Sequence, residues 1–231
     1  MVKIELTQLY NASVHLGHKI HEWNPKMLPY IYTETKGSHV LDLVQIKSCL
    51  ESACNFSKNA SRNKKTFLFL NTSKKTAPFI ASQAKKCGAF FVNYRWLGGI
   101  LTNWVTVKKR IDRLNELEEE EKLTSFKDFS KKERSILKKE LEKLKKYFTG
   151  IKKMTKLPDI LILVNQKREI IAIKEALSLK IPIITILDTD CNPDLTTLPI
   201  PGNDDSTLSV HYIIQKLTDS ICLGQLNSKE I

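Results

Sequence analysis

Short apolar runs alternate along the chain with stretches whose apolar residues recur every three or four positions. The runs with the pattern of strands are, in chain order, 38–43, 66–70, 90–92, 160–164, 182–187 and 198–200. The stretches between most of them predict helices of roughly 12 residues or more. Thr72 or Ser73 can cap the helix that follows 66–70, and Asp204 or Asp205 caps a last helix that ends at Gly224. Strands that alternate with helices form right-handed βαβ units, whose strands are parallel. The pattern therefore predicts an α/β protein built on a parallel sheet.

A charge-dense region, residues 104–150, interrupts this alternation. One apolar seam consists of Trp104, Val107, Ile111, Leu114 and Leu117. A second consists of Ile136 or Leu137, then Leu141, Leu144 and Phe148. Ser130 and Glu133 have the spacing of a capping box, which marks the start of the second helix. The region predicts an antiparallel helical hairpin whose arms project on the order of 20 Å or more, at about 1.5 Å per residue.

The N-terminal residues have a different character. Residues 4–12 predict a short amphipathic helix, whereas Gly17, Pro25 and Pro29 exclude a long helix from residues 15–32 and predict an extended arm rich in rings. The domain division that follows is 1–35 for the helix and arm, 36–103 with 151–225 for the α/β/α core, 104–150 for the hairpin, and 226–231 for a flexible tail.

The net charge of the chain is the most informative feature of its composition. Lysine and arginine number 37 against 25 acidic residues, which gives a net charge of +12 and a pI near 9.4. Such a surplus favours a polyanionic partner, because each neutralised phosphate releases counterions. Paired lysines are scattered along the chain, which suggests a protein embedded in nucleic acid. A generically soluble basic surface is the alternative.

The spacing of the cysteines and the hydropathy of the chain indicate in which kind of compartment the protein works. The five cysteines are widely spaced and include no Cys-x-x-Cys, which favours free thiols in a reducing compartment. The longest apolar run, 181–187, is interrupted by Pro182 and Thr185, so no membrane span is expected. The N-terminus also lacks the pattern of a signal peptide.

The stretch 93–104 is the point around which the chain is organised. Gly98 and Gly99 allow a sharp turn, and Arg95 and Trp96 offer a cation and a flat ring suited to phosphate and base contact. The alternative is that Trp96 and its apolar neighbours are core residues. Candidate RNA-contact residues are Lys19, Trp23, Lys26, Arg95, Trp96, Asn103, Lys108, Lys109, Lys152 and Lys153.

Metal binding and catalysis receive less support. His15, His18 and His21 are spaced by three, but Gly17 weakens the helix that would align them, so neither a metal nor a cofactor is expected. Carboxylates after the last strands mark where an enzyme would hold Mg²⁺ or acid–base groups: Asp188, Asp190, Asp194, Asp204 and Asp205. No Gly-rich phosphate loop accompanies them. An enzyme or binding protein for a phosphate-bearing ligand, using Asp188 and Asp204, stays as the alternative.

Six motifs in order resemble one family, the small-subunit ribosomal protein two family of bacteria and organelles. They are His15-x-Gly17-His18, Trp23-Asn-Pro-Lys-Met27 with Pro29-Tyr30-Ile31, Arg95-Trp-Leu-Gly-Gly-x-Leu-Thr-Asn103, Gly150-Ile-Lys with Met154 and Leu157-Pro-Asp159, Asp188-Thr-x-Cys-x-Pro-Asp194, and Ile200-Pro-Gly-Asn-Asp-Asp205. They extend over residues 12–224, nearly the whole chain. Asn165 is a departure, because the family frequently has Asp there.

The resemblance implies a flavodoxin-like, doubly wound parallel sheet of about five strands with a protruding helical hairpin, seated between the head and body of the small ribosomal subunit. It implies contact with small-subunit rRNA, with neighbouring ribosomal proteins and with the mRNA-recruiting ribosomal protein. It implies no enzyme activity and no homo-oligomer. The sequence looks closest to chloroplast members, with a bacterial cytoplasm as the competing location. A free-standing RNA-binding module is a third hypothesis.

Overall fold

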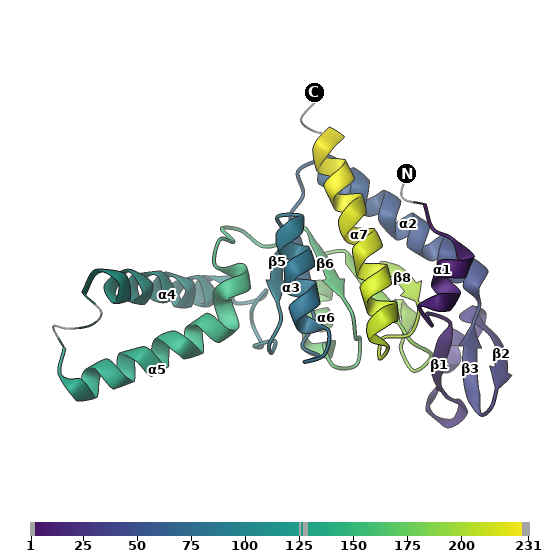
Figure 1. Cartoon of the computed structure of the whole chain (residues 1–231), viewed down its shortest axis with the longest axis horizontal. Coiled ribbons are helices and arrows are strands. Elements are labelled where there is room, and N and C mark those ends of the chain that lie inside the picture. Colours follow the sequence, from purple (N-terminus) through teal and green to yellow (C-terminus); the bar gives the residue numbers. More distant parts are fainter. Residues whose placement is uncertain (1–2, 125, 127–128, 228–231) are drawn as a thin grey trace.

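Five parallel strands form the central sheet of the computed structural model, which describes residues 3–124, 126 and 129–227 (Figure 1). They are β4 (Phe67–Leu70), β5 (Phe90–Val92), β6 (Ile160–Leu163), β7 (Ile183–Leu187) and β8 (Leu198–Pro201). Their spatial order is β5-β4-β6-β7-β8, so the chain runs outward from β4 to β5 and then crosses back to β6. This reversal is the doubly wound, flavodoxin-like order, and it confirms the predicted fold class.

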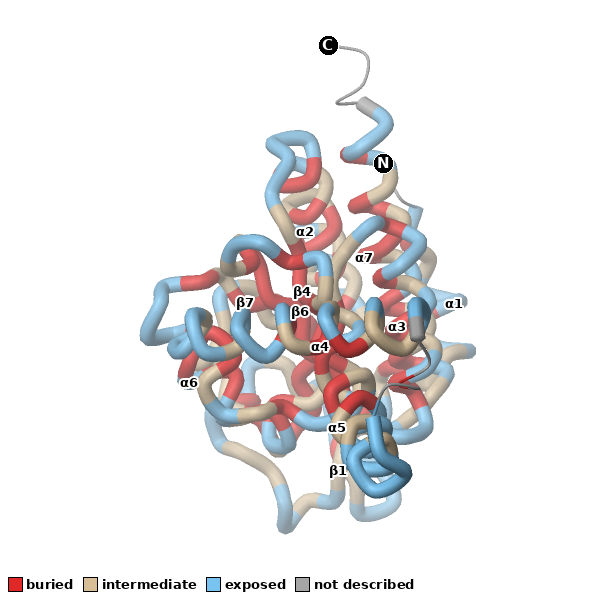
Figure 2. Tube along the Cα trace, turned by 90° about the vertical axis from the view of Figure 1, so that its left-hand side faces the viewer, coloured by how far each residue is buried: buried red, intermediate tan, exposed pale blue. Residues whose placement is uncertain are grey.

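Helices cover both faces of this sheet. On one face lie α1 (Leu6–Asn11), α2 (Leu43–Arg62), α3 (Ala77–Lys86) and α7 (Thr207–Asn227). On the other lie α6 (Ile170–Ser178) and the base of the hairpin. Phe67 and Phe69 of β4 face the first layer, whereas Leu68 and Leu70 face the second. Strands buried on both faces read as uninterrupted apolar runs, and Figure 2 shows the buried segments gathered between the two layers.

The hairpin is formed as predicted by α4 (Trp104–Thr124) and α5 (Lys131–Phe148), and it protrudes from one end of the molecule (Figure 1). Ser130 and Glu133 make both bonds of the capping box. The two seams face each other, with Ile111, Leu114 and Leu141 buried between the helices. Leu137 is packed against the seam, while Ile136 is 57% exposed.

The extended arm is more regular than predicted, because it pairs with the strand expected at 38–43. β1 (Leu16–Lys19) and β2 (Ile31–Thr35) flank β3 (Ser38–Leu41) in an antiparallel sheet of their own. The short 3-10 helices η1 (Ile20–Glu22) and η2 (Pro25–Tyr30) link β1 to β2. β3 was expected in the parallel sheet, and its hydrogen bonding to the arm corrects that expectation.

Three predicted helix ends differ from the structure. Gly224 does not end the last helix but lies inside α7, where it lets the helix approach the Lys58 carbonyl of α2. Neither Asp204 nor Asp205 caps α7; the Ser206 hydroxyl accepts the Ser209 N–H instead. Neither Thr72 nor Ser73 caps α3 with its side chain, and Thr76 holds the N-cap position. Of the predicted flexible tail 226–231, residues 226 and 227 belong instead to α7, and residues 228–231 lie outside the described residues.

All five cysteines are free thiols, as expected for a reducing compartment. Burial raises the pKa of Cys54 and of Cys87 to about 11, so both stay protonated at neutral pH. Within the described part of the chain, no helix combines the length and the apolar content needed to cross a bilayer.

Candidate nucleic-acid interface

Glu175 of α6 shapes the organising stretch 93–104. Its Oε1 accepts the Trp96 indole N–H at 2.9 Å and the Gly99 amide at 2.7 Å. Its Oε2 accepts the Leu101 amide at 2.9 Å and the Thr102 amide at 3.3 Å. Burial opposes ionisation of Glu175, but these hydrogen bonds outweigh it and hold the pKa of the carboxyl below its ordinary value. The turn is therefore wrapped around a buried carboxylate.

This arrangement decides where Trp96 lies. The side chain is 6% exposed and its N–H is bonded to Glu175, so little of the ring reaches the surface. Ile100 and Leu101 are buried beside it. The structure thus places Trp96 in the core, which was the alternative interpretation of this residue. In a sequence, a single Glu in an amphipathic helix cannot be told from a solvent-exposed Glu. The role of Glu175 as a buried acceptor was therefore not predicted.

A basic and aromatic surface gathers next to this turn. We call it the hairpin-base patch and define it as Lys74, Tyr94, Arg95, Lys146 and Tyr147. The Lys146 ammonium lies 4.0 Å from the centroid of the Tyr94 ring, and that ring meets Tyr147 edge-on at 5.4 Å. The hydrogen bond from Lys146, with weaker contributions from Lys74 and Arg95, lowers the pKa of Tyr94. The Tyr94 ring is exposed and Tyr147 is half-buried, and an exposed ring beside cations suits the bases and phosphates of RNA.

Sequence reasoning found Arg95 of this patch and missed the other four members. Tyr94 adjoins Arg95 in the chain and could have been found from that position. Lys74 and Lys146 come from a loop after β4 and from α5, so only the fold brings them together.

The other candidates near the hairpin are mostly accessible. Asn103, Lys108 and Lys109 are exposed around the first turns of α4, and Lys153 is exposed beyond α5. Lys152 is half-buried and pairs with Glu118 of α4. Its charge is thus partly used within the chain, where it ties the segment after α5 to α4.

The arm candidates form a second, separate group. Lys19 is exposed at the end of β1, and Lys26 pairs with Asp194. Trp23 is half-buried, with its ring 5.3 Å from the ring of His39. The arm and the hairpin lie at opposite ends of the long axis in Figure 1, so the candidates occupy two surfaces.

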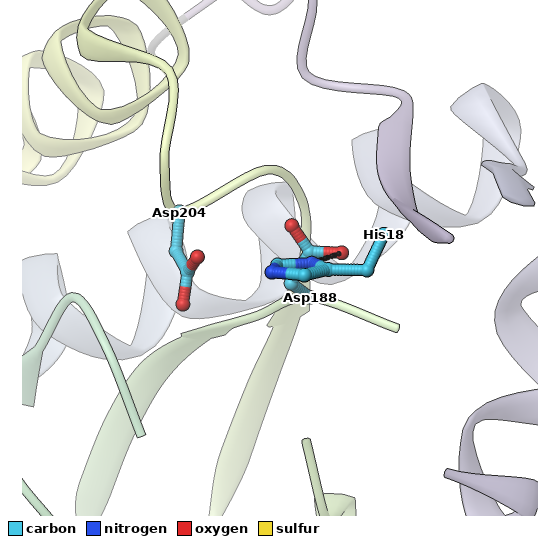
Figure 3. Close-up of side chains that lie close together, drawn as sticks. All are labelled: His18, Asp188 and Asp204. Atoms are coloured by element: carbon cyan, nitrogen blue, oxygen red, sulfur yellow. Dashed lines mark ion pairs between the residues drawn. The ribbon is translucent and has the colours of Figure 1, made fainter. Parts of the chain in front are cut away.

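The predicted carboxylates also gather, at the carboxyl ends of β7 and β8. His18 of β1 reaches them, with Nδ1 3.0 Å from Asp188 Oδ1 (Figure 3). The hydrogen bond to Asp188 raises the pKa of His18 to about 9, although burial opposes it. Burial, together with the neighbouring carboxylates, raises the pKa of Asp204 to about 8. Asp194 lies apart from His18 in its pair with Lys26.

Comparison with known proteins places the chain in a family. The family described as ribosomal protein S2 matches residues 9–224. The chain belongs to the ribosomal protein S2 family. A similar protein of Guillardia theta, named small ribosomal subunit protein uS2c, is 52% identical, with 98% of this chain and 97% of the relative covered. The uS2c of Porphyra purpurea is 49% identical over 100% of this chain and 95% of the relative.

A cyanobacterial relative extends the same similarity. The small ribosomal subunit protein uS2 of Picosynechococcus is 48% identical, with 97% of this chain and 88% of the relative covered.

Two glycines of the family motifs lie at close contacts between elements of this chain. A Cβ on Gly17 would lie 2.5 Å from Thr189 Cγ2, and one on Gly150 would lie 2.0 Å from the Phe91 carbonyl oxygen. Both motif glycines therefore mark places where backbone must approach another element.

Proposed function

We propose that this chain is a structural constituent of the small ribosomal subunit, where it contacts small-subunit rRNA and neighbouring ribosomal proteins in support of translation. The observation that carries the proposal is the ribosomal protein S2 match over residues 9–224, together with relatives near 50% identity named as small-subunit proteins. The net charge of +12 agrees with an RNA partner. The relatives named uS2c support a plastid location.

The two groups of candidate RNA-contact residues support a position between parts of the subunit. The hairpin-base patch and the exposed residues near the start of α4 lie at one end, and the arm with Lys19 lies at the other. A molecule with candidate RNA contacts at both ends is suited to a position between the head and the body of the small subunit. Neighbouring ribosomal proteins, including one that recruits mRNA, are the protein partners of this proposal.

The residues that we propose to face RNA differ from the candidates predicted from the sequence. It keeps Arg95, Asn103, Lys108, Lys109, Lys153 and Lys19, and it adds Lys74, Tyr94 and Lys146. Trp96 is left out because it is 6% exposed. Lys26 and Lys152 contribute less, because each is paired with a carboxylate of this chain.

The enzyme alternative finds no support in the comparisons, since the family and the relatives reported above are named as ribosomal proteins. The cluster at Asp188 and Asp204 therefore needs another explanation than catalysis.

Sedimentation tests the proposal. The full chain, tagged at one end, is expressed in the source plastid or a related host, and the lysate is separated on a sucrose gradient at moderate salt. We expect the tag to peak with the small subunit. A doubly substituted chain, Arg95→Ala with Lys146→Ala, should shift toward the top of the gradient. Lys86→Ala is the matched control, because Lys86 is an exposed lysine that pairs with Asp219 away from the patch. A wild-type tag that stays at the top of the gradient would contradict the proposal.

A further inference from the structure

His18, Asp188 and Asp204 meet at the junction between the arm and the core. His18 belongs to β1, Asp188 directly follows β7, and Asp204 lies in the loop between β8 and α7. The arm is docked here by backbone contacts as well: the His18 amide donates to Thr189 Oγ1 at 3.0 Å, and the Asn24 amide donates to the Thr189 carbonyl at 2.8 Å. Three distant segments thus present ligand-type side chains to one point.

The side-chain geometry is close to that of a cation site. One ligand atom from each of His18, Asp188 and Asp204 lies within 4.8 Å of the other two. Asp190 and Asp205 stand around this group, with carboxylate oxygens 3.9 and 3.7 Å from His18 Nε2. Protein metal ligands sit about 2.0–2.2 Å from a bound Zn²⁺, so three ligand atoms this close can share one ion after a small closure.

Asp204 supplies an observation independent of the clustering. Its side chain points toward the His18 ring in Figure 3, and the residue is 8% exposed. Oδ2 accepts the Asn165 side-chain amide at 2.8 Å, but among the described residues Oδ1 has no hydrogen-bond partner. A buried carboxylate oxygen without a donor is costly, and a cation at this point would satisfy it.

The charge balance points the same way. Four carboxylates converge here: Asp188, Asp190, Asp204 and Asp205. Lys167 neutralises one of them, since its ammonium lies 2.6 Å from Asp190, and a protonated His18 neutralises a second, since its Nδ1 lies 3.0 Å from Asp188. Asp188 is 1% exposed and Asp204 is 8% exposed, so water screens little of the charge on either carboxylate, and a bound cation would stabilise both in their ionised form.

We propose that His18, Asp188 and Asp204 bind one divalent transition-metal cation of the Zn²⁺ class, which locks the arm to the core. One imidazole with two carboxylates is a nitrogen and oxygen donor set that suits Zn²⁺, whereas Mg²⁺ prefers oxygen ligands alone. The cation has a structural role, because it links β1 to the loops after β7 and β8. The site is independent of RNA binding, so its test uses the purified chain.

Calorimetric titration of the chelator-treated full chain with ZnCl₂ tests the site. We expect one equivalent to bind, and both His18→Ala and Asp204→Asn to weaken binding at least tenfold. Matched controls are His21→Ala, an exposed histidine of the same arm, and Asp194→Asn, whose carboxylate pairs with Lys26. Both controls should bind as the wild type does. Absence of saturable binding to the wild type, or equal binding by the site variants, would overturn the proposal.

A spectroscopic measurement on the wild type avoids dependence on variants that fold poorly. X-ray absorption of the Zn²⁺-loaded chain should show nitrogen and oxygen neighbours, including the multiple-scattering signature of one imidazole. Cys191 is buried nearby, with its thiol 3.3 Å from Asp190. A sulfur neighbour in the spectrum would assign the ion to a cysteine and would refute the His18–Asp188–Asp204 site.

Discussion

At the scale of single residues, Glu175 has the most consequence for the organising stretch. One carboxylate of α6 accepts hydrogen bonds from Trp96, Gly99, Leu101 and Thr102, so it fixes the backbone that presents Arg95. Amide donors in that turn have no comparable acceptor if the charge is removed. A buried acceptor shared by several donors is expected to contribute more than an exposed ion pair.

Glu175→Gln should therefore destabilise the chain by about 2–4 kcal/mol, because charged hydrogen bonds are lost and the new amide N–H₂ group faces donors. Urea unfolding followed by circular dichroism measures the change. Glu116→Gln is the matched control, since Glu116 is an exposed glutamate paired with Arg113 and should lose less than about 1 kcal/mol. Equal effects of the two substitutions would contradict this role of Glu175.

The same group predicts a pH dependence. The folded pKa of Glu175 lies below its ordinary value of about 4.3. A carboxyl group whose pKa is lowered by folding stabilises the fold at pH values above its unfolded pKa. This contribution is lost as the pH falls through the folded pKa. The gap in unfolding free energy between wild type and Glu175→Gln should be constant near neutral pH and narrow below about pH 4. Urea midpoints across an acid pH series measure it, and a gap that widens toward acid would have the wrong sign.

The residue scale also shows what sequence could predict of the site. Arg95, Lys108 and Lys109 were found because exposed cations beside a motif or on a helix are visible in sequence. Tyr94, Lys146 and Lys74 come together only through the packing of α5 and the β4 loop against the turn. Glu175 and Asp204 are polar residues whose roles depend on burial, which a sequence pattern does not reveal.

At the scale of elements, close backbone approaches determine how the layers join. Gly150 follows α5 and sits against the Phe91 carbonyl of β5, while Gly224 of α7 sits against Lys58 of α2. A side chain in place of either glycine would push the two elements of that pair apart. The hairpin is therefore held to the sheet by more than its apolar seam.

Gly150→Ala should destabilise the chain by roughly 1–3 kcal/mol, since its Cβ would lie 2.0 Å from the Phe91 carbonyl oxygen and the rigid backbone must shift. Gly98→Ala is the matched control, because no atom outside its immediate neighbours lies within 4 Å of a Cβ there. Thermal unfolding of both variants measures the difference. A Gly150→Ala chain as stable as Gly98→Ala would show that β5 and the end of α5 can separate without cost.

Most elements were predictable because their periodicity is strong. Strands β4, β6 and β7 are apolar on both faces, and the seams of α4 and α5 repeat over several turns. The small sheet was not predicted, because β1 is short and Gly17, Pro25 and Pro29 weaken any local pattern. Its strands are specified by pairing with β3 and by docking on the Asp188 loop, which are contacts distant in sequence. The end of α7 was missed because Gly224 serves packing rather than termination.

At the scale of the whole molecule, the hairpin and the arm extend from opposite ends of one three-layer core (Figure 1). A net charge of +12 makes copies of the chain repel one another. We therefore predict that the purified chain is a monomer. Sedimentation equilibrium should give a mass near 26.5 kDa, independent of concentration at moderate salt. A mass that approaches a dimer as concentration rises would contradict the prediction that the chain is no homo-oligomer.

Salt dependence separates a subunit component from a free-standing RNA-binding module. Contacts made by Arg95 and Lys146 to phosphate release counterions, so the affinity for small subunits depleted of this protein should fall as salt rises. Replacing either residue by Ala should reduce the slope of log affinity against log salt by about 1, whereas Lys86→Ala should leave it unchanged. Filter binding to depleted subunits and to isolated rRNA fragments measures both. Because the two groups of candidate RNA-contact residues lie at opposite ends, no short fragment can engage both, and binding to fragments should be weaker than binding to subunits. Equal affinity for a fragment and for the subunit would instead identify a self-sufficient RNA-binding module.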